Sequence, residues 1–119
     1  MSMGTRTLIE KYHQAWTAGD FATARACLAD DLDFSGSIES FHTADELVAA
    51  LTGFQGMLSG VTLLASHFGE DGAALLYDCV TPTPAGTIRT AEFFTVAGGR
   101  ITRIDLVFDP TELRKLMQG

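Results

Sequence analysis

The apolar positions of this chain follow two different periods. Over most of the chain up to Gly60 they recur every three or four residues, which is the spacing of one face of a helix. From Val61 to Phe108 they alternate with polar residues, which is the spacing of strands that bury one face. We therefore expect helices in the first half of the chain and an antiparallel sheet in the second.

Two helices are predicted at the start of the chain. The first ends at Gly19, because glycine suits the left-handed conformation of a C-terminal cap. The second begins after Asp20, whose carboxylate can accept from free amides at a helix start, and closes at Asp30-Asp31. The apolar face of the first helix consists of Leu8, Tyr12, Ala15 and Trp16.

A third helix begins at a capping box formed by Thr43 and Glu46, whose side chains can each satisfy a free amide. It ends at Gly60, and its apolar residues follow at spacings of four, three and four. A final short helix begins within Asp109–Glu112, with the aspartate as its cap.

A sheet of four to six strands is predicted, and the last four of the candidate strands form a meander. The candidate strands are residues 32–34, 38–41, 61–68, 73–81, 87–96 and 100–108. Since the helices that precede the meander are its only available cover, the predicted class is α+β, with N-terminal helices packed against the sheet.

Hairpin register predicts which residues face the helices. Centring the 82–86 loop places Asp78 opposite Arg89, a favourable charge pair that belongs on the wetter face. Alternation then puts Glu92 on the apolar face, together with Tyr77 and Thr90. A three-residue turn at 97–99 keeps even positions opposite even positions in the next hairpin. The apolar members of the inner face are Leu75, Cys79, Ile88, Phe94, Val96, Ile104, Leu106 and Phe108.

The outer face of the same sheet is half apolar. Asp78, Arg89, Arg103 and Asp105 alternate there with aliphatic and aromatic side chains, Phe93 among them. An apolar surface of this extent on a small acidic protein indicates a partner, so we expect a homodimer through the outer face.

Glu92 and Tyr12 are the residues that the sequence suggests as functional groups of a site. A carboxyl on an apolar face has its charged form disfavoured, so its pKa should rise. A buried phenol needs a hydrogen-bond partner. Together, a neutral carboxylic acid and a phenol in one cavity would be two donors aimed at a ligand oxygen.

Composition excludes several classes of protein. The 119 residues fit one domain spanning 1–119, and the net charge of −7 argues against nucleic-acid or anionic-membrane partners. There is no apolar run of membrane-spanning length and no secretory signal, so we expect a cytoplasmic location. Cys27 and Cys79 lie in apolar contexts and are expected to be buried thiols rather than a disulfide. No metal or phosphate-binding motif is present, so no cofactor is expected.

The chain resembles a known family over nearly its whole length, and four segments carry that resemblance. They are residues 12–20 (YHQAWTAGD), 27–34 (CLADDLDF), 91–101 (AEFFTVAGGRI) and 106–109 (LVFD). On these the chain resembles the nuclear transport factor 2-like superfamily, in particular its SnoaL-like polyketide cyclases and ketosteroid isomerases. This fold hosts enzymes and plain binding modules alike.

The resemblance implies a cone-shaped barrel with an apolar pocket at its open end. In ketosteroid isomerases a tyrosine and a protonated acid polarise a carbonyl while a second acid moves the proton. By position these donors are Tyr12 and Glu92, whereas the base position falls on Gly36, which has no side chain. The family's epoxide hydrolases use an Asp-Arg-Asp arrangement, but the predicted register puts Asp78 and Arg89 outside.

Two classes of function therefore stay open. One is acid–base isomerisation, cyclisation, dehydration or hydrolysis of a small hydrophobic carbonyl compound, with Glu92 and Tyr12 as donors and His67 or Asp33 as base. The other is a non-catalytic binding or dimerising module, which the glycine at position 36 favours. Each candidate has a structural alternative: Glu92 bonded to Tyr77 or Thr90, Tyr12 as a core aromatic, and His67 and Asp33 as ordinary strand residues. The predicted pocket walls are Trp16, Phe34, Phe54, Tyr77, Thr90, Phe94, Ile104, Leu106 and Phe108.

Overall fold

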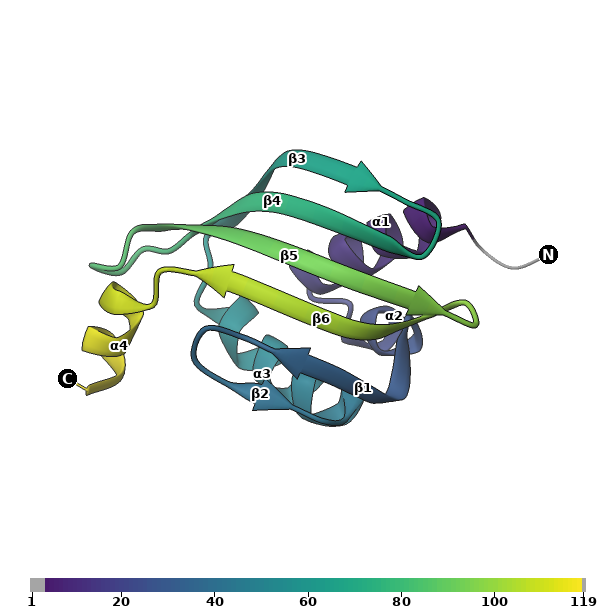
Figure 1. Cartoon of the computed structure of the whole chain (residues 1–119). Coiled ribbons are helices and arrows are strands. Elements are labelled where there is room, and N and C mark those ends of the chain that lie inside the picture. Colours follow the sequence, from purple (N-terminus) through teal and green to yellow (C-terminus); the bar gives the residue numbers. More distant parts are fainter. Residues whose placement is uncertain (1–3, 119) are drawn as a thin grey trace.

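The computed structural model describes residues 4–118, and side chains as far as Leu116. Helices cover one face of a single curved sheet of six strands (Figure 1). The helices are α1 (Thr5–Thr17), α2 (Phe21–Ala26), α3 (Ala44–Gly56) and α4 (Thr111–Gln118).

The sheet has the strand order β2-β1-β6-β5-β4-β3, in which only β1 and β6 are parallel. Its strands are β1 (Leu28–Ser35), β2 (Ser40–Phe41), β3 (Gly60–Phe68), β4 (Gly72–Val80), β5 (Thr87–Ala97) and β6 (Arg100–Phe108). The expected α+β class is thus confirmed. The sheet is bent but not closed, because β2 and β3 remain its two edges.

Helix starts follow the predicted capping residues. The Asp20 carboxylate accepts from the Thr23 backbone amide at 3.2 Å and begins α2. The Thr43 hydroxyl accepts from the Glu46 amide at 3.2 Å and begins α3. Local side-chain contacts are sufficient for these starts, which is why the sequence predicts them.

Two predicted helix ends are wrong, and sheet pairing explains both. The second helix ends at Ala26, and Asp30 and Asp31 belong to β1, because the Ile101 amide already donates to the Cys27 carbonyl at 2.9 Å. The third helix ends at Gly56 rather than Gly60. There the Ser59 amide donates to the Val80 carbonyl at 2.8 Å and draws the chain into the sheet.

The register of the β4–β5 hairpin agrees with the prediction. Asp78 lies opposite Arg89 and Tyr77 opposite Thr90. The Arg89 guanidinium donates to both oxygens of Asp78, at 2.9 and 3.1 Å. This pair lies on the outer face, and Glu92 on the inner face is 2% exposed.

The β5–β6 hairpin has the predicted pairing of even-numbered with even-numbered residues, but a bulge rather than a three-residue turn produces it. Ala97 pairs with Arg100, so the turn has two residues, Gly98 and Gly99, with φ of +59° and +73°. With this two-residue turn and no bulge, even-numbered residues of β5 would lie opposite odd-numbered residues of β6, and the inner and outer faces of β6 would be exchanged. A bulge at Thr102 restores them, so that Phe94 still lies opposite Ile104.

A second bulge, in β3, turns His67 away from the inner face, where a residue acting as the base would have to lie. The register of β3 against β4 shifts between Leu63 and Ala65, so the face of every later residue is reversed. His67 lies opposite Ala74 on the outer face and is exposed, whereas Phe68 takes the inward position. The alternation of apolar residues does not reveal this reversal, since Leu63 and Leu64 are both apolar and both exposed.

The buried core lies between the helices and the inner face of the sheet. Cys27 and Cys79 are buried there as free thiols, as expected, and burial raises the pKa of both. Within the part of the chain that the structure describes, no helix is long and apolar enough to cross a membrane.

Candidate functional site

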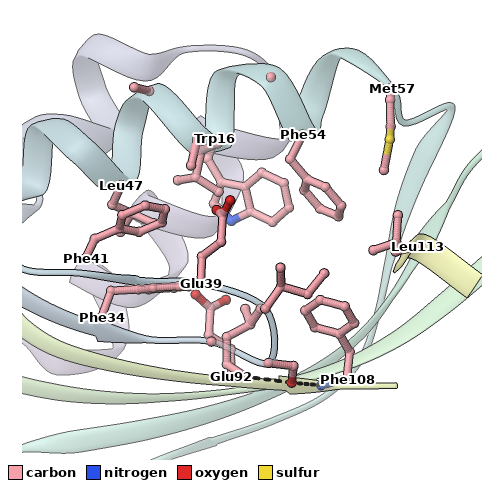
Figure 2. A pocket seen from close by; sticks show the side chains of 18 of the residues that line it. Trp16, Phe34, Glu39, Phe41, Leu47, Phe54, Met57, Glu92, Phe108 and Leu113 are labelled. Atoms are coloured by element: carbon pink, nitrogen blue, oxygen red, sulfur yellow. Dashed lines mark hydrogen bonds between the residues drawn. The ribbon is translucent and has the colours of Figure 1, made fainter. Parts of the chain in front are cut away.

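A cavity of about 570 Å³ lies between α1 and α3 on one side and the inner face of the sheet on the other (Figure 2). Its volume is within the range of pockets that bind small organic ligands. Eight predicted site residues line it: Tyr12, Trp16, Phe34, Phe54, Tyr77, Glu92, Leu106 and Phe108.

Glu92 is the polar group at the sheet side of this cavity. Its side chain rises from β5 into the cavity (Figure 2). Its Oε1 accepts a hydrogen bond from the Tyr77 hydroxyl at 2.9 Å. Burial raises the pKa of Glu92 from 4.5 to about 7, while the Tyr77 hydrogen bond lowers it slightly. At neutral pH, therefore, Glu92 can both hold and release a proton.

Two tyrosines flank Glu92. Burial raises the pKa values of Tyr12 and Tyr77 well above the usual value, and the negative charge of Glu92 adds to the effect in both. Both phenols consequently stay protonated and can act only as neutral hydrogen-bonding groups. The Tyr12 ring also packs edge-on against Phe94, with centroids 6.0 Å apart.

Trp16 forms part of the opposite wall. It is 1% exposed, and its ring centroid lies 6.0 Å from that of Tyr77 and 6.4 Å from that of Phe54. Its indole Nε1 is buried and has no hydrogen-bond partner within the part of the chain that the structure describes. Behind it, burial lowers the pKa of His13 from 6.5 to about 4, so this imidazole is neutral, and its Nδ1 also lacks a partner.

The structure does not bring His67 or Asp33 to the cavity. His67 lies on the outer face for the reason given above. Asp33 is half exposed and accepts from Arg103 at 2.8 Å, with His42 Nδ1 at 3.1 Å. Neither is in a position to act as the base that we expected of it.

Three predicted wall residues belong to the core beneath the cavity instead. Thr90, Phe94 and Ile104 are buried on the inner face but do not line the cavity. The cavity occupies one end of the inner face, and β-strand alternation reports which face a residue occupies but not which end of it.

The chain closes the cavity with two segments that the sequence did not indicate. One is the connection between β1 and β2, which contributes Glu39; Figure 2 shows this carboxyl among the lining side chains. The other is α4, which contributes Leu113 and Leu116. The sequence predicts this final helix, but nothing local indicates where a terminal helix packs.

Gly36, the position of the base in the resemblance, cannot carry a side chain without rearrangement. A Cβ there would lie 2.9 Å from Phe34 Cε1 and 3.0 Å from the Glu39 carbonyl oxygen. The Phe34 ring is itself stacked on Phe41, with centroids 5.5 Å apart. A base at position 36 would therefore require the Phe34 ring and the loop backbone at Glu39 to shift.

Charge in the lining is confined to two carboxyl groups. Among the residues described, Glu39 and Glu92 line the cavity together with no lysine, arginine or histidine. No group of three or more metal-binding side chains occurs within 4–116. The lining therefore disfavours an anionic ligand, since an anion would meet carboxyl groups without a compensating cation.

Comparisons with known proteins agree with this architecture. The sequence model for the SnoaL-like domain matches residues 9–104. A crystal structure of a protein from Kribbella flavida is 31% identical, with 93% of this chain and 91% of that chain covered and a TM-score of 0.86. No curated protein matches significantly in sequence.

More distant structures show the fold alone. A nuclear transport factor 2-like protein of unknown function from Cytophaga hutchinsonii is 18% identical, covering 96% of this chain and 97% of that one, with a TM-score of 0.82. A Sinorhizobium meliloti protein, provisionally described as a polyketide cyclase, is 17% identical, covering 84% and 93%, with a TM-score of 0.75.

Proposed function

Because the chain belongs to the SnoaL-like domain family, we propose that its cavity binds a small, neutral, apolar molecule with a carbonyl oxygen and that Glu92 exchanges a proton with it. The observation that carries this proposal is a carboxyl, 2% exposed, inside an otherwise largely apolar cavity. Buried acids are costly and occur preferentially at functional sites.

Glu92 has the properties of a general acid. Its pKa of about 7 lies near working pH, where a proton donor and acceptor is most effective. The Tyr77 hydrogen bond engages Oε1 and leaves Oε2 for the ligand. In the protonated form Oε2–H would donate to the carbonyl oxygen and stabilise the negative charge that develops on it.

Glu39 is our candidate for the group that removes the proton. It is the second carboxyl of the lining and lies three residues beyond Gly36 in the same loop. Its carboxylate would take a proton from the carbon next to the carbonyl, while Glu92 delivers one to the oxygen, giving an enol. Return of a proton to a different carbon would complete an isomerisation, and attack of the enol on a second carbonyl would complete a cyclisation.

Binding without turnover is the second candidate function. The observation that favours it is Gly36, because the family position for the base is closed by packing. In this case Glu92 would serve only to orient a ligand oxygen.

Exchange of ketone hydrogens for deuterium separates the two functions without knowledge of the natural substrate. With 2-acetylnaphthalene in D2O, we expect the protein to accelerate loss of the acetyl proton signal in NMR. Glu92→Gln and Glu39→Gln should each slow the exchange by about a hundredfold or more, in line with the usual contribution of a general acid or base.

Glu70→Gln is the matched control, since Glu70 lies in the β3–β4 turn, away from the cavity. Binding of the ketone with no accelerated exchange would establish the non-catalytic alternative. Absence of binding, or exchange that is equal in all four proteins, would overturn the proposal.

A further inference from the structure

The indole N–H of Trp16 is a buried donor with nothing to donate to. Trp16 is 1% exposed, and no group within residues 4–116 is placed to accept a hydrogen bond from Nε1. Buried polar groups in native proteins are nearly always satisfied, so an orphaned one requires an explanation. An indole nitrogen donates only, so whatever satisfies it must be an acceptor.

The neighbours of Trp16 do not supply an acceptor. The side chains stacked nearby are His13, Phe54 and Tyr77. The Tyr77 hydroxyl oxygen and His13 Nδ1 could each accept a hydrogen bond, but neither is placed to accept from Nε1, which has no hydrogen-bond partner among the described residues. The acceptor must come from elsewhere, and Trp16 is a lining residue of the cavity.

Trp16 and Glu92 belong to the same part of that cavity. Tyr77 links them, since its ring packs 6.0 Å from the indole and its hydroxyl bonds to Glu92 at 2.9 Å. In Figure 2 the nitrogen-bearing edge of the indole is turned towards the carboxyl groups of the lining rather than towards Phe54 and Met57.

We propose that Trp16 Nε1–H donates a hydrogen bond to an oxygen of the bound ligand and thereby selects oxygenated apolar molecules over hydrocarbons of the same shape. This rests on the proposed function and extends it. The ligand class becomes a neutral ketone, ester or lactone whose oxygen function lies at the Trp16–Glu92 end, with its hydrocarbon part towards Met57 and Leu113. Aromatic and aliphatic side chains dominate that remaining part of the lining.

The single tryptophan of the chain makes this proposal directly measurable. A ¹⁵N–¹H correlation spectrum contains one indole resonance, which needs no assignment. The probes are 2-acetylnaphthalene and 2-ethylnaphthalene, which are similar in shape but differ in the carbonyl oxygen. We expect the ketone to move the indole proton downfield and the hydrocarbon to leave it nearly in place.

Variants test the same hydrogen bond through the affinities of the two probes. Trp16→Phe removes the donor and should reduce the preference for ketone over hydrocarbon about tenfold, the effect expected when one neutral hydrogen bond is lost. Phe54→Leu is the matched control, because it shrinks the same wall without removing a polar atom and should weaken both probes equally.

The outcomes separate this inference from the function on which it rests. If the ketone binds and Glu92→Gln weakens it, but the indole signal responds alike to both probes, the role of Trp16 is wrong and the proposed function stands. An equal loss of both probes in Trp16→Phe would likewise refute the role of Trp16. If neither probe binds the wild-type protein, both proposals are wrong.

Discussion

Glu92 and His13 are both buried, and burial moves their pKa values in opposite directions. The pKa of Glu92 rises from 4.5 to about 7, and that of His13 falls from 6.5 to about 4. In each case the charged form is disfavoured by loss of water. Both side chains are therefore neutral over part of the mildly acidic range, where they could otherwise carry charge.

These shifts make opposite contributions to the pH dependence of stability. The folded state holds the Glu92 proton between pH 4.5 and about 7, so its contribution to stability falls as pH rises through that range. The folded state resists protonation of His13 between 6.5 and about 4, so its contribution falls as pH is lowered through that range. The two effects overlap and partly cancel in the native protein.

Comparing the native protein with Glu92→Gln isolates the contribution of Glu92, because His13 contributes to the stability of both proteins. We expect the variant to gain stability relative to the native protein as pH rises from 4.5 to 7, by about 3 kcal/mol in all, because only the native protein then has to bury a charge. Urea denaturation of both proteins across this range measures the difference. A difference that does not change with pH would show that the pKa of Glu92 is not raised.

At the scale of elements, short-range and long-range interactions determine different features. Helix starts depend on side chains within three residues, as at Asp20 and Thr43. Helix ends and bulges depend on strands that are distant in sequence. The bulges at Leu64 and Thr102 determine which face later residues occupy, and Thr102 keeps Ile104 inward.

The Thr43 cap should be measurable by itself. Thr43→Ala removes the acceptor for the Glu46 amide and is expected to lower the free energy of unfolding by about 1 kcal/mol. Thr52→Ala is the matched control within the same helix. Its hydroxyl donates only to the Val48 carbonyl, which the helix already satisfies, and alanine has the higher helix propensity. Equal destabilisation by both substitutions in thermal unfolding would refute the assigned cap.

At the scale of the whole molecule, the outer face of the sheet is the surface that we expect a partner to cover. Phe93 and Val107 are 48% and 55% exposed there. The charges around them include both signs, with Arg103 donating to Asp33 and Asp105. A second copy of the chain could approach this face without the repulsion that the net charge of −7 would otherwise cause.

We therefore propose a homodimer through the outer face. Light scattering coupled to size-exclusion chromatography should give twice the mass of one chain at micromolar concentration, and Phe93→Glu should give a monomer. Leu116→Glu, which changes an exposed apolar residue on α4, should leave the mass unchanged. A monomeric native protein would refute the proposal.

The sequence by itself determined the order of elements, the helix starts, the β4–β5 register and the inward position of Glu92. All of these follow from spacing and capping over a few residues. Only the tertiary structure decided where α2 and α3 end, which way His67 faces, and that Glu39 and α4 close the cavity. These features depend on hydrogen bonds and packing between segments far apart in the chain, which no local pattern records. The orphaned nitrogen of Trp16 belongs to the same group, because a missing partner becomes visible only when every neighbour is in place.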